Sequence, residues 1–368
     1  MGRQIFIEPV DVWLFRDGRP FTGGEDIRAK SQFPPSPLTL QGAIRSKLLS
    51  LSGVDLADEG AVRQEAEKLG IGWDVSDFGS FRLKGPLVAK RDGKGNLQRL
   101  LPPPADLVAT KEDCELFLAE PAELPSEISV SPLPEGGLLP VWVKSYKPVE
   151  PPKGWLTEDS FKRYLRGDIS GLDFLKPAEV AARERRTGIR LAGERRTVEE
   201  GMLYQAEFVR LREGVGLWAE VDGVELPQRG EILLGGEGKA ARFESINPPL
   251  SSLDAELREE ALSGRWERFK VVLLTPAYFG KGWGPDQGWD KFFGAEVTLK
   301  GLALPRPLFI GGHGLVKGER EVRPFVPPGA VYFFEGSPKT LPQGFTESPP
   351  NWDEIWKIGF GLYAIGRW

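Results

Sequence analysis

A well-marked helix start at Ser36 and Pro37 is the feature that most constrains the fold. Ser36 can accept a hydrogen bond from the first free backbone amides, and Pro37 at the next position needs no amide partner. Pro34 and Pro35 hold the entering chain extended. The apolar residues that follow fall on one side at helical spacing; they are Leu38, Leu40, Ala43, Ile44, Leu48, Leu49 and Leu51. The sequence therefore predicts a helix over residues 37–51.

A long polar loop precedes this helix and follows a mostly apolar strand predicted at residues 3–15. A loop of about 20 residues between a strand and its helix is uncommon in a compact domain, and such loops are usually functional or disordered. This one carries aromatic residues and charges of both signs, which favours function. On the helix, Gly42 lowers helix propensity, so its presence suggests close packing or close approach of a ligand. Arg45 and Lys47 lie beside it on the more polar face.

Composition bounds the class of protein. The chain has 368 residues, 40% of them hydrophobic, which favours two domains. No apolar run of about 18 residues occurs, so we expect no membrane span, and a cytoplasmic location is the default. One cysteine, Cys114, and one histidine, His313, exclude a cysteine-based metal cage and the usual Ser-His-Asp arrangement. We therefore expect neither a metal site nor a cofactor.

The remaining elements follow from local signals. Helices are predicted at 58–69, 157–166 and 252–264, and strands at 78–90, 97–101, 202–212, 215–221, 231–234 and 330–335. Residues 102–155 are rich in proline and also carry tryptophan and tyrosine, which favours an ordered surface insertion. At 269–279 a second buried strand leads into a polar aromatic loop and repeats the opening design. We therefore place two domains at 1–265 and 266–368.

Charge is unevenly distributed along a chain whose net charge is −5. Residues 183–196 hold six arginines against Glu184 and Glu194, and residues 81–100 hold six basic residues against Asp92. Arginine makes planar bidentate contacts to phosphate and also stacks on bases. The first cluster predicts a basic hairpin around a turn at residues 192–193. A local basic track on an acidic body fits a subunit that contacts a nucleic acid and also a protein partner.

These residues also have purely structural interpretations. The arginines of 183–196 could form a solvated surface that pairs with neighbouring acids. Arg16 and Arg19, which could grip phosphates, could instead pair with Asp17 at the strand end. Phe21 could stack on a base or belong to the core.

The single histidine lies in a predicted glycine loop, GGHG at 311–314. His313 could be structural, or it could stack on RNA while the glycines expose backbone amides to phosphate. A general-base role would need a charge stabiliser such as Lys317, and no partner is visible in the sequence.

Two passages of the opening stretch carry a family resemblance: FIEPVDVWLFRDGRPF at 6–21 and FPPSPLTLQGAIRSKLL at 33–49. Together with ERRTGIRLAGERRTVEEGMLY at 184–204, FKVVLLTPAYF at 269–279 and the glycine-rich end, they resemble the RAMP proteins of CRISPR effector complexes. Within that group the chain is most similar to the third Cmr subunit of type III-B complexes. The resemblance touches most of the chain, although the proline-rich insertion adds nothing to it.

This resemblance implies an α+β fold of two ferredoxin-like, RRM-related domains with long, partly β-rich insertions. It implies a non-catalytic subunit that grips the 5′ handle of the CRISPR RNA (crRNA), docks the large polymerase-like subunit and abuts the backbone RAMP subunits. Combined with the charge pattern, it gives a set of expected RNA contacts. They are Arg16, Arg19, Phe21, Lys30, Gly42, Arg45, Lys47, Arg183, Arg185, Arg186, Arg190, Arg195, Arg196, His313 and Lys317.

Two other functions stay open at this point. The first is a metal-independent endoribonuclease that processes CRISPR repeat RNA, with His313 as its base. The second is a protein-interaction scaffold without RNA contact, which would use the proline-rich insertion and exposed tryptophans. The acidic net charge keeps the scaffold in consideration, because part of the surface must serve something other than RNA.

Overall fold

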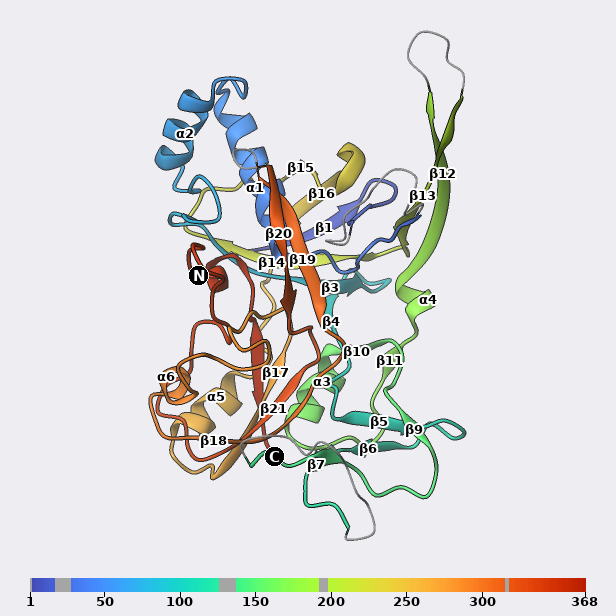
Figure 1. Ribbon diagram of the computed structural model, residues 1–368, viewed down its shortest axis with the longest axis vertical. Coiled ribbons are helices and arrows are strands. Elements are labelled where there is room, and N and C mark those ends of the chain that lie inside the picture. The colour runs from blue at the N-terminus through green and yellow to red at the C-terminus, as the bar shows by residue number, and fades with distance from the viewer. Residues whose placement is uncertain (1, 17–27, 126–136, 192–197, 315–317) are drawn as a thin grey trace.

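The computed structural model describes residues 2–16, 28–125, 137–191, 198–314 and 318–368. Two antiparallel sheets organise the chain, and helices and smaller strand pairs surround them (Figure 1). This arrangement confirms the α+β class. Within the described ranges, no helix is long and apolar enough to cross a membrane.

The first sheet has eight strands and buries both of its faces around β1 (Arg3–Pro9), an inner strand that lies between β14 and β16. Ile5 and Ile7 of β1 point into one core, while Phe6 between them points into another, as alternation along a strand requires. The strand order is β11 (Phe174–Leu175), β10 (Trp155–Thr157), β4 (Leu97–Leu101), β3 (Arg82–Arg91), β14 (Val215–Asp222), β1, β16 (Ala240–Ser245) and β15 (Arg229–Leu233).

Two helices, α1 (Pro37–Ser52) and α2 (Glu59–Lys68), cover the Ile5 face and complete the first core. Pro37 occupies the first turn of α1, as predicted, but the capping prediction for Ser36 is wrong. The Ser36 side chain accepts no helix amide; its Oγ lies 3.2 Å from Thr39 Oγ1 instead. The side chain of Asp58 does cap α2, where it accepts a hydrogen bond from the amide of Ala61 at 3.0 Å.

The second sheet has four strands in the order β18 (Thr298–Ala303), β21 (Val331–Glu335), β17 (Arg268–Leu273) and β22 (Tyr363–Gly366). The helices nearest to it in sequence are α5 (Ala255–Leu262) and α6 (Asp290–Phe293). All neighbouring strands are antiparallel. The strand predicted at 269–279 ends earlier, at Leu273, shortly before Pro276, which has no amide to donate.

The second core lies between the two sheets. Phe6 and Trp218 of the first sheet share it with aromatic residues of the second, such as Phe269 and Phe334, whose rings stack 5.2 Å apart. The short 3₁₀ turn η2 (Ile355–Ile358) belongs to the C-terminal part of the chain but packs into the first core. Along the chain, all strands of the first sheet come before residue 265 and all strands of the second sheet come after it. The domain boundary at that residue remains a prediction.

One prediction for the C-terminal part needs correction. Residues 310–314, expected to form a glycine loop, belong to strand β19 (Leu308–Gly314), which pairs with β20 (Gly318–Phe325) in an antiparallel hairpin. Ile310 and Phe325 anchor this hairpin in the first core. Cross-strand pairing therefore overrides the loop preference of the glycines.

The described part of the proline-rich insertion is ordered, as predicted, and consists of short strands. They are β5 (Leu107–Thr110), β6 (Leu116–Leu118), β7 (Glu120–Pro121), β8 (Val141–Trp142) and β9 (Val149–Glu150). A buried network ties the insertion to the second sheet and to α3 (Glu158–Leu165). Lys270 Nζ lies 2.8 Å from Asp106 Oδ2, and the hydroxyl of Tyr164 donates to Asp106 Oδ1 at 2.6 Å.

Candidate RNA interface

A long hairpin formed by β12 (Ala181–Leu191) and β13 (Val198–Leu211) projects from the body of the molecule (Figure 1). The strands pair from Ala181 opposite Leu211 to Ile189 opposite Leu203, which confirms the hairpin predicted from the sequence. Its turn, with Arg195 and Arg196, lies outside the described residues, as does the side chain of Arg190. Short helix α4 (Pro177–Val180) leads into its root.

The opening stretch of the chain returns to this hairpin. Strand β2 (Arg28–Ala29) pairs in parallel with β13, with Arg28 opposite Gln205. Trp13 exchanges backbone hydrogen bonds of 2.9 and 2.8 Å with Val209, and Arg16 forms a bridge with Ser31. These contacts place the strand end, the returning segment and the hairpin root side by side.

Three predicted RNA contacts lie at this junction. Arg183 of β12 donates a hydrogen bond to the carbonyl of Ser31, and Lys30, the residue before it, is exposed. Arg16, across the bridge from Ser31, is exposed as well. Two other predicted contacts, Arg19 and Phe21, lie outside the described residues.

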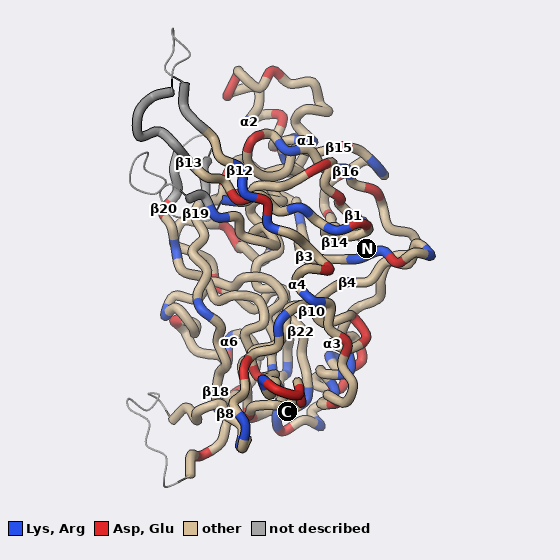
Figure 2. The backbone as a smooth tube through the Cα atoms, turned by 90° about the vertical axis from the view of Figure 1, so that its right-hand side faces the viewer, with Lys and Arg blue, Asp and Glu red and all other residues tan. Residues whose placement is uncertain are grey.

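Ion pairs hold the hairpin root together. Arg210 donates at 2.8 Å to both Glu184 and Asp11, and Arg186 reaches the same two carboxylates at 2.7 and 3.6 Å. Hydrogen bonds from the arginines lower the pKa of Glu184 and of Asp11 below their ordinary values, so both remain ionised at neutral pH. Figure 2 shows acidic and basic residues next to each other in this region.

The arginines of β12 differ in how firmly they are held. Arg183 lies 3.4 Å from Glu207, and Arg186 is engaged by two carboxylates. The side chain of Arg185 is 70% exposed, and its ion pair with Glu207 spans 3.9 Å. Arg185 is therefore the most open of the three. The structural interpretation of the cluster holds for Arg186, whereas Arg185 keeps its donors accessible.

A second set of contacts at the root was not predicted from the sequence. Phe208 of β13 is buried against Val12 and Leu14. The guanidinium carbon of Arg186 lies 4.7 Å from the centre of the Phe208 ring, and Lys239 Nζ lies 5.2 Å from the same ring centre. The sequence did contain a signal for these contacts. Side chains alternate between the two faces of a strand, so a strand over residues 202–212 places Phe208 and Arg210 on the same face.

The α1 residues have different surroundings. Arg45 donates a hydrogen bond to the carbonyl of Gly72, which gives it a structural role. A Cβ added to Gly42 would meet no atom within 4 Å, so close packing does not explain this glycine. Lys47 is half-buried, and its stem lies near Gly230 of β15. Within the part of the chain that the structure describes, no hydrogen bond or ion pair links Lys47 to the β12–β13 hairpin.

The β19–β20 hairpin holds the last predicted contacts. Residue His313 pairs with Glu319 across the strands, but its side chain and Lys317 lie outside the described residues. Figure 1 shows both long hairpins pointing toward the same end of the molecule, and Figure 2 places both on the same side. The fold thus presents two hairpins near the segment that follows β1.

The basic run at residues 81–100 is used within the protein. Lys84 pairs with Glu220 at 2.7 Å, Arg91 pairs with Glu244, and buried Arg99 lies 2.9 Å from Glu158. These acids come from distant parts of the chain, so the local count of charges overstated the available positive charge. Three of the six cations of this run are therefore committed to ion pairs within the protein.

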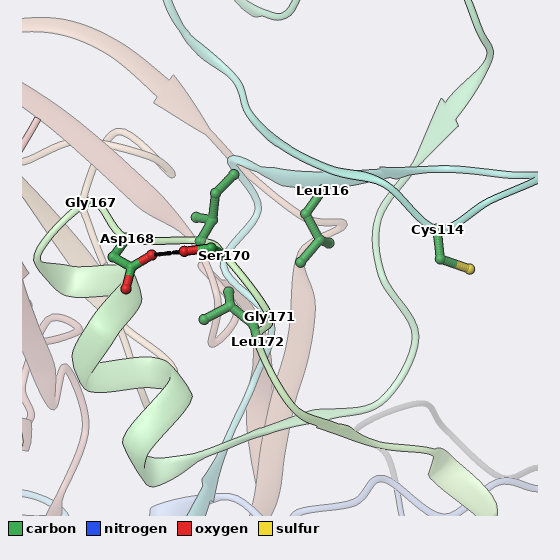
Figure 3. Close-up of a pocket in the computed structure, with 8 residues that line it drawn as sticks. Cys114, Leu116, Gly167, Asp168, Ser170, Gly171 and Leu172 are labelled. Carbon is green, nitrogen blue, oxygen red and sulfur yellow. Dashed lines mark hydrogen bonds between the residues drawn. The ribbon is translucent and has the colours of Figure 1, made fainter.

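A shallow hollow lies away from the hairpins (Figure 3). It is lined by residues 167–172 with Leu116 and the exposed Cys114. Hydrogen bonds from Ser170 and then Arg163 lower the pKa of Asp168 to about 2. In the described parts of the chain, no cluster of His, Cys, Asp and Glu is arranged to hold a metal ion.

Solved structures of CRISPR complexes contain similar chains. One chain of a type III-B Cmr-beta complex bound to cognate target RNA is 14% identical, with a TM-score of 0.49; the match covers 90% of this chain and 86% of the other. A chain of a Csm3–Csm4 subcomplex of the type III-A interference complex is 13% identical, with a TM-score of 0.37 and coverage of 94% and 100%. No curated protein shows significant sequence similarity to the chain.

The sequence itself matches a family model over almost its whole length. Residues 5–368 fit the model described as CRISPR-associated protein (Cas_Cmr3). The match includes both sheets, the insertion and both hairpins, and it agrees with the resemblance in the motifs at 6–21 and 33–49. The chain therefore belongs to the Cas_Cmr3 family of CRISPR-associated proteins.

Proposed function

We propose that the chain is the crRNA-binding subunit of a type III-B (Cmr) effector complex and holds the 5′ handle of the RNA at the root of the β12–β13 hairpin. Membership of the Cas_Cmr3 family supports a type III-B CRISPR effector subunit. The observation that carries the RNA proposal is the junction of the opening stretch with the basic hairpin. Arg16, Lys30 and Arg183 meet there although up to 167 residues separate them in sequence.

The charge balance at this junction suits phosphate binding. An arginine that is paired with one carboxylate still has N–H groups to donate, because the guanidinium carries five. Lys30 has no ion pair within the described residues, and Arg185 has only a long one. Each phosphate that such residues neutralise should add about 0.7 to the slope of log K against log salt for a single strand.

The proposed subunit is non-catalytic. This proposal is supported by the scarcity of histidine: the sequence contains one, His313, and it lies in a strand of the β19–β20 hairpin. The role in the complex is to hold the handle, dock the large polymerase-like subunit and abut the backbone RAMP subunits. Target cleavage then belongs to neighbouring subunits.

We further infer that both sheets belong to ferredoxin-like domains. Numbered in chain order, the strands of the second sheet lie in the order 2-3-1-4. The central strands β3, β14, β1 and β16 of the first sheet have the same order and are antiparallel throughout. Helices α1 and α2 follow the first strand of one set, and α6 follows the first strand of the other. Both sets thus support the split β-α-β plan.

The decisive experiment compares two arginines with similar surroundings. Arg185 and Arg63 are both exposed on the surface, 70% and 65%, and each has one ion pair of about 4 Å. We expect Arg185→Ala, combined with Lys30→Ala, to reduce the crRNA content of the purified complex and to lower the salt slope. Arg63→Ala in α2 should change neither.

Full crRNA content in the Arg185/Lys30 variant, at every salt concentration tested, would contradict the proposed surface. Sequencing of the bound RNA adds a second criterion. Binding should depend strongly on the 5′ handle and weakly on the spacer. A complex that forms without RNA would favour the scaffold alternative.

A further inference from the structure

A cavity of about 210 Å³ lies where the two halves of the chain meet beside the hairpin root. Its walls come from the segment before α1, from β3 and β4, and from the C-terminal segments around Pro276 and Pro327. Several lining residues, including Phe33, Trp155 and Leu308, are only half-buried, so the cavity opens to the surface.

The lining is apolar and rigid. Eight of its residues are prolines, whose rings have few conformations to lose when a ligand binds. Rings of Phe33 and Trp155 stand edge to face, with their centres 6.4 Å apart. Apart from the indole N–H of Trp155, only Gln32 and Thr275 among the lining residues have polar side-chain groups. The hydroxyl of Thr275 already donates to Gly359 and accepts from Leu362.

This lining determines the chemical class of the occupant. A polar group that is buried without a hydrogen bond is destabilising, so a fully inserted nucleobase would leave most of its polar edge unsatisfied. An apolar cavity of about 150 Å³ in another protein holds a benzene ring, so this one has room for an aromatic or branched aliphatic side chain. Pockets of this kind receive the anchor residues of protein interfaces.

Charges around the opening indicate what flanks that side chain. Lys30 lies two residues before Gln32, Arg306 lies two residues before Leu308, and Lys176 follows Leu175, which pairs with Trp155. All three cations are exposed, and none of them has an ion pair within the described ranges. A partner with carboxylates beside its apolar side chain would complement this rim.

We propose that this cavity is the docking socket for a neighbouring protein subunit, which inserts one aromatic or branched aliphatic side chain flanked by acidic residues. This inference rests on the proposed membership of a multi-subunit complex, but not on the hairpin as the RNA site. It gives the junction beside the hairpin root a second partner. The hairpin takes RNA, and the socket takes protein.

Photo-crosslinking in the assembled complex tests the occupant. The probe is p-benzoylphenylalanine at Leu308, whose half-buried side chain lines the cavity on strand β19. We expect a crosslink to a peptide of another subunit that has an apolar residue next to Asp or Glu. The same probe at Leu262, 44% exposed at the end of α5, is the control. A crosslink from position 308 to RNA, or only within this chain, would overturn the proposal.

Two variants measure the contribution of the socket. Leu308→Trp fills the cavity, and Lys176→Glu with Arg306→Glu reverses most of its rim while it leaves Lys30, a residue of the proposed RNA surface, unchanged. Each should weaken binding of the crosslinked subunit at least about tenfold, while Lys339→Glu, an exposed lysine elsewhere, should not. Equal thermal unfolding of all variants serves as the folding control. Unchanged subunit affinity in the filled variant would refute the socket.

The RNA content of the same preparations separates this proposal from the proposed function. Filling the socket should release the protein partner and leave crRNA bound through the hairpin. The Arg185→Ala variant, which keeps the rim cations, should retain the protein partner and lose RNA. Loss of RNA with retention of every protein subunit in Leu308→Trp would identify the cavity as an RNA site and refute the docking proposal.

Discussion

Replacing Lys270 with methionine would leave the buried carboxylate of Asp106 with one polar side-chain partner, the hydroxyl of Tyr164. The side chains of Lys270 and Asp106 are only 3% and 1% exposed, and their charged atoms lie 2.8 Å apart. Lys270 Nζ also lies 3.9 Å from the centre of the Tyr164 ring. The network joins the proline-rich insertion to β17 and α3, so the effect should reach the whole fold.

The magnitude follows from the geometry. At an effective dielectric constant of about 20, two unit charges 2.8 Å apart attract by about 6 kcal/mol, and desolvation offsets much of this. Removing one partner of a buried pair typically costs about 3–5 kcal/mol, because the remaining charge stays buried. With an unfolding entropy of about 0.8 kcal/mol/K for a chain of this length, the melting temperature should fall by about 4–6 °C.

Thermal and urea unfolding followed by circular dichroism would measure this loss. The double variant Asp106→Leu/Lys270→Met should be less destabilised than the sum of the two single variants, because no uncompensated charge remains. Lys147→Met is the matched control: its pair with Asp113 has a similar length, 2.6 Å, but is about half exposed. Its cost should be much smaller than that of Lys270→Met, because solvent screens the exposed pair. Additive single effects, or a loss in Lys270→Met no larger than in the control, would refute this reasoning.

Three further predictions test single residues. Burial alone would raise the pKa of Glu158, but hydrogen bonds from Arg99 and Lys162 outweigh it and lower the pKa below its ordinary value of 4.5. The ionised Glu158 carboxylate should stabilise the folded protein above pH 4.5, and this stabilisation should be lost as the pH falls through the lowered pKa. The acid unfolding curve of Glu158→Gln should therefore lack the loss of stability in that pH range. Gly42→Ala should raise the free energy of unfolding by up to about 1 kcal/mol, because the added methyl meets no atom and alanine favours helix. If RNA approaches Gly42, the same variant will bind crRNA less tightly in a filter-binding assay. Unchanged binding will exclude that approach. His313→Ala should leave target cleavage unchanged in the assembled complex, and the purified wild-type chain should not cut repeat RNA. Site-specific cleavage that this variant abolishes would establish the endoribonuclease instead.

Local signals in the sequence predicted local structure well. The Ser-Pro step located the start of α1, the helix predicted at 58–69 corresponds to α2, and the strands predicted at 78–90 and 97–101 correspond to β3 and β4. The two arginine-rich stretches on either side of residue 192 predicted the β12–β13 hairpin. In each case the determining residues lie within a few positions of one another, so the sequence alone contains the information.

Partners from distant parts of the chain could not be predicted in this way. No residue near Arg28 in the sequence indicates that Arg28 pairs with Gln205 across the strands. Likewise, no residue near Arg99 indicates that it forms a buried ion pair with Glu158. The glycines at 311–314 suggested a loop because the pairing with β20 depends on the tertiary fold. The candidate site is therefore known from the sequence as a set of residues, whereas its arrangement required the structure.

The first core also constrains the order in which this protein can mature on the ribosome. Ile355, Ile358 and Phe360 are almost completely buried in that core together with Ile5 and Ile7, about 350 residues earlier in the chain. The N-terminal half is synthesised first, but its apolar surface stays uncovered until those last turns have emerged. At about 5–20 residues per second, the wait lasts tens of seconds. During that time the nascent chain presents an incomplete core to chaperones, and a truncation that removes residues 355–360 would make this state permanent.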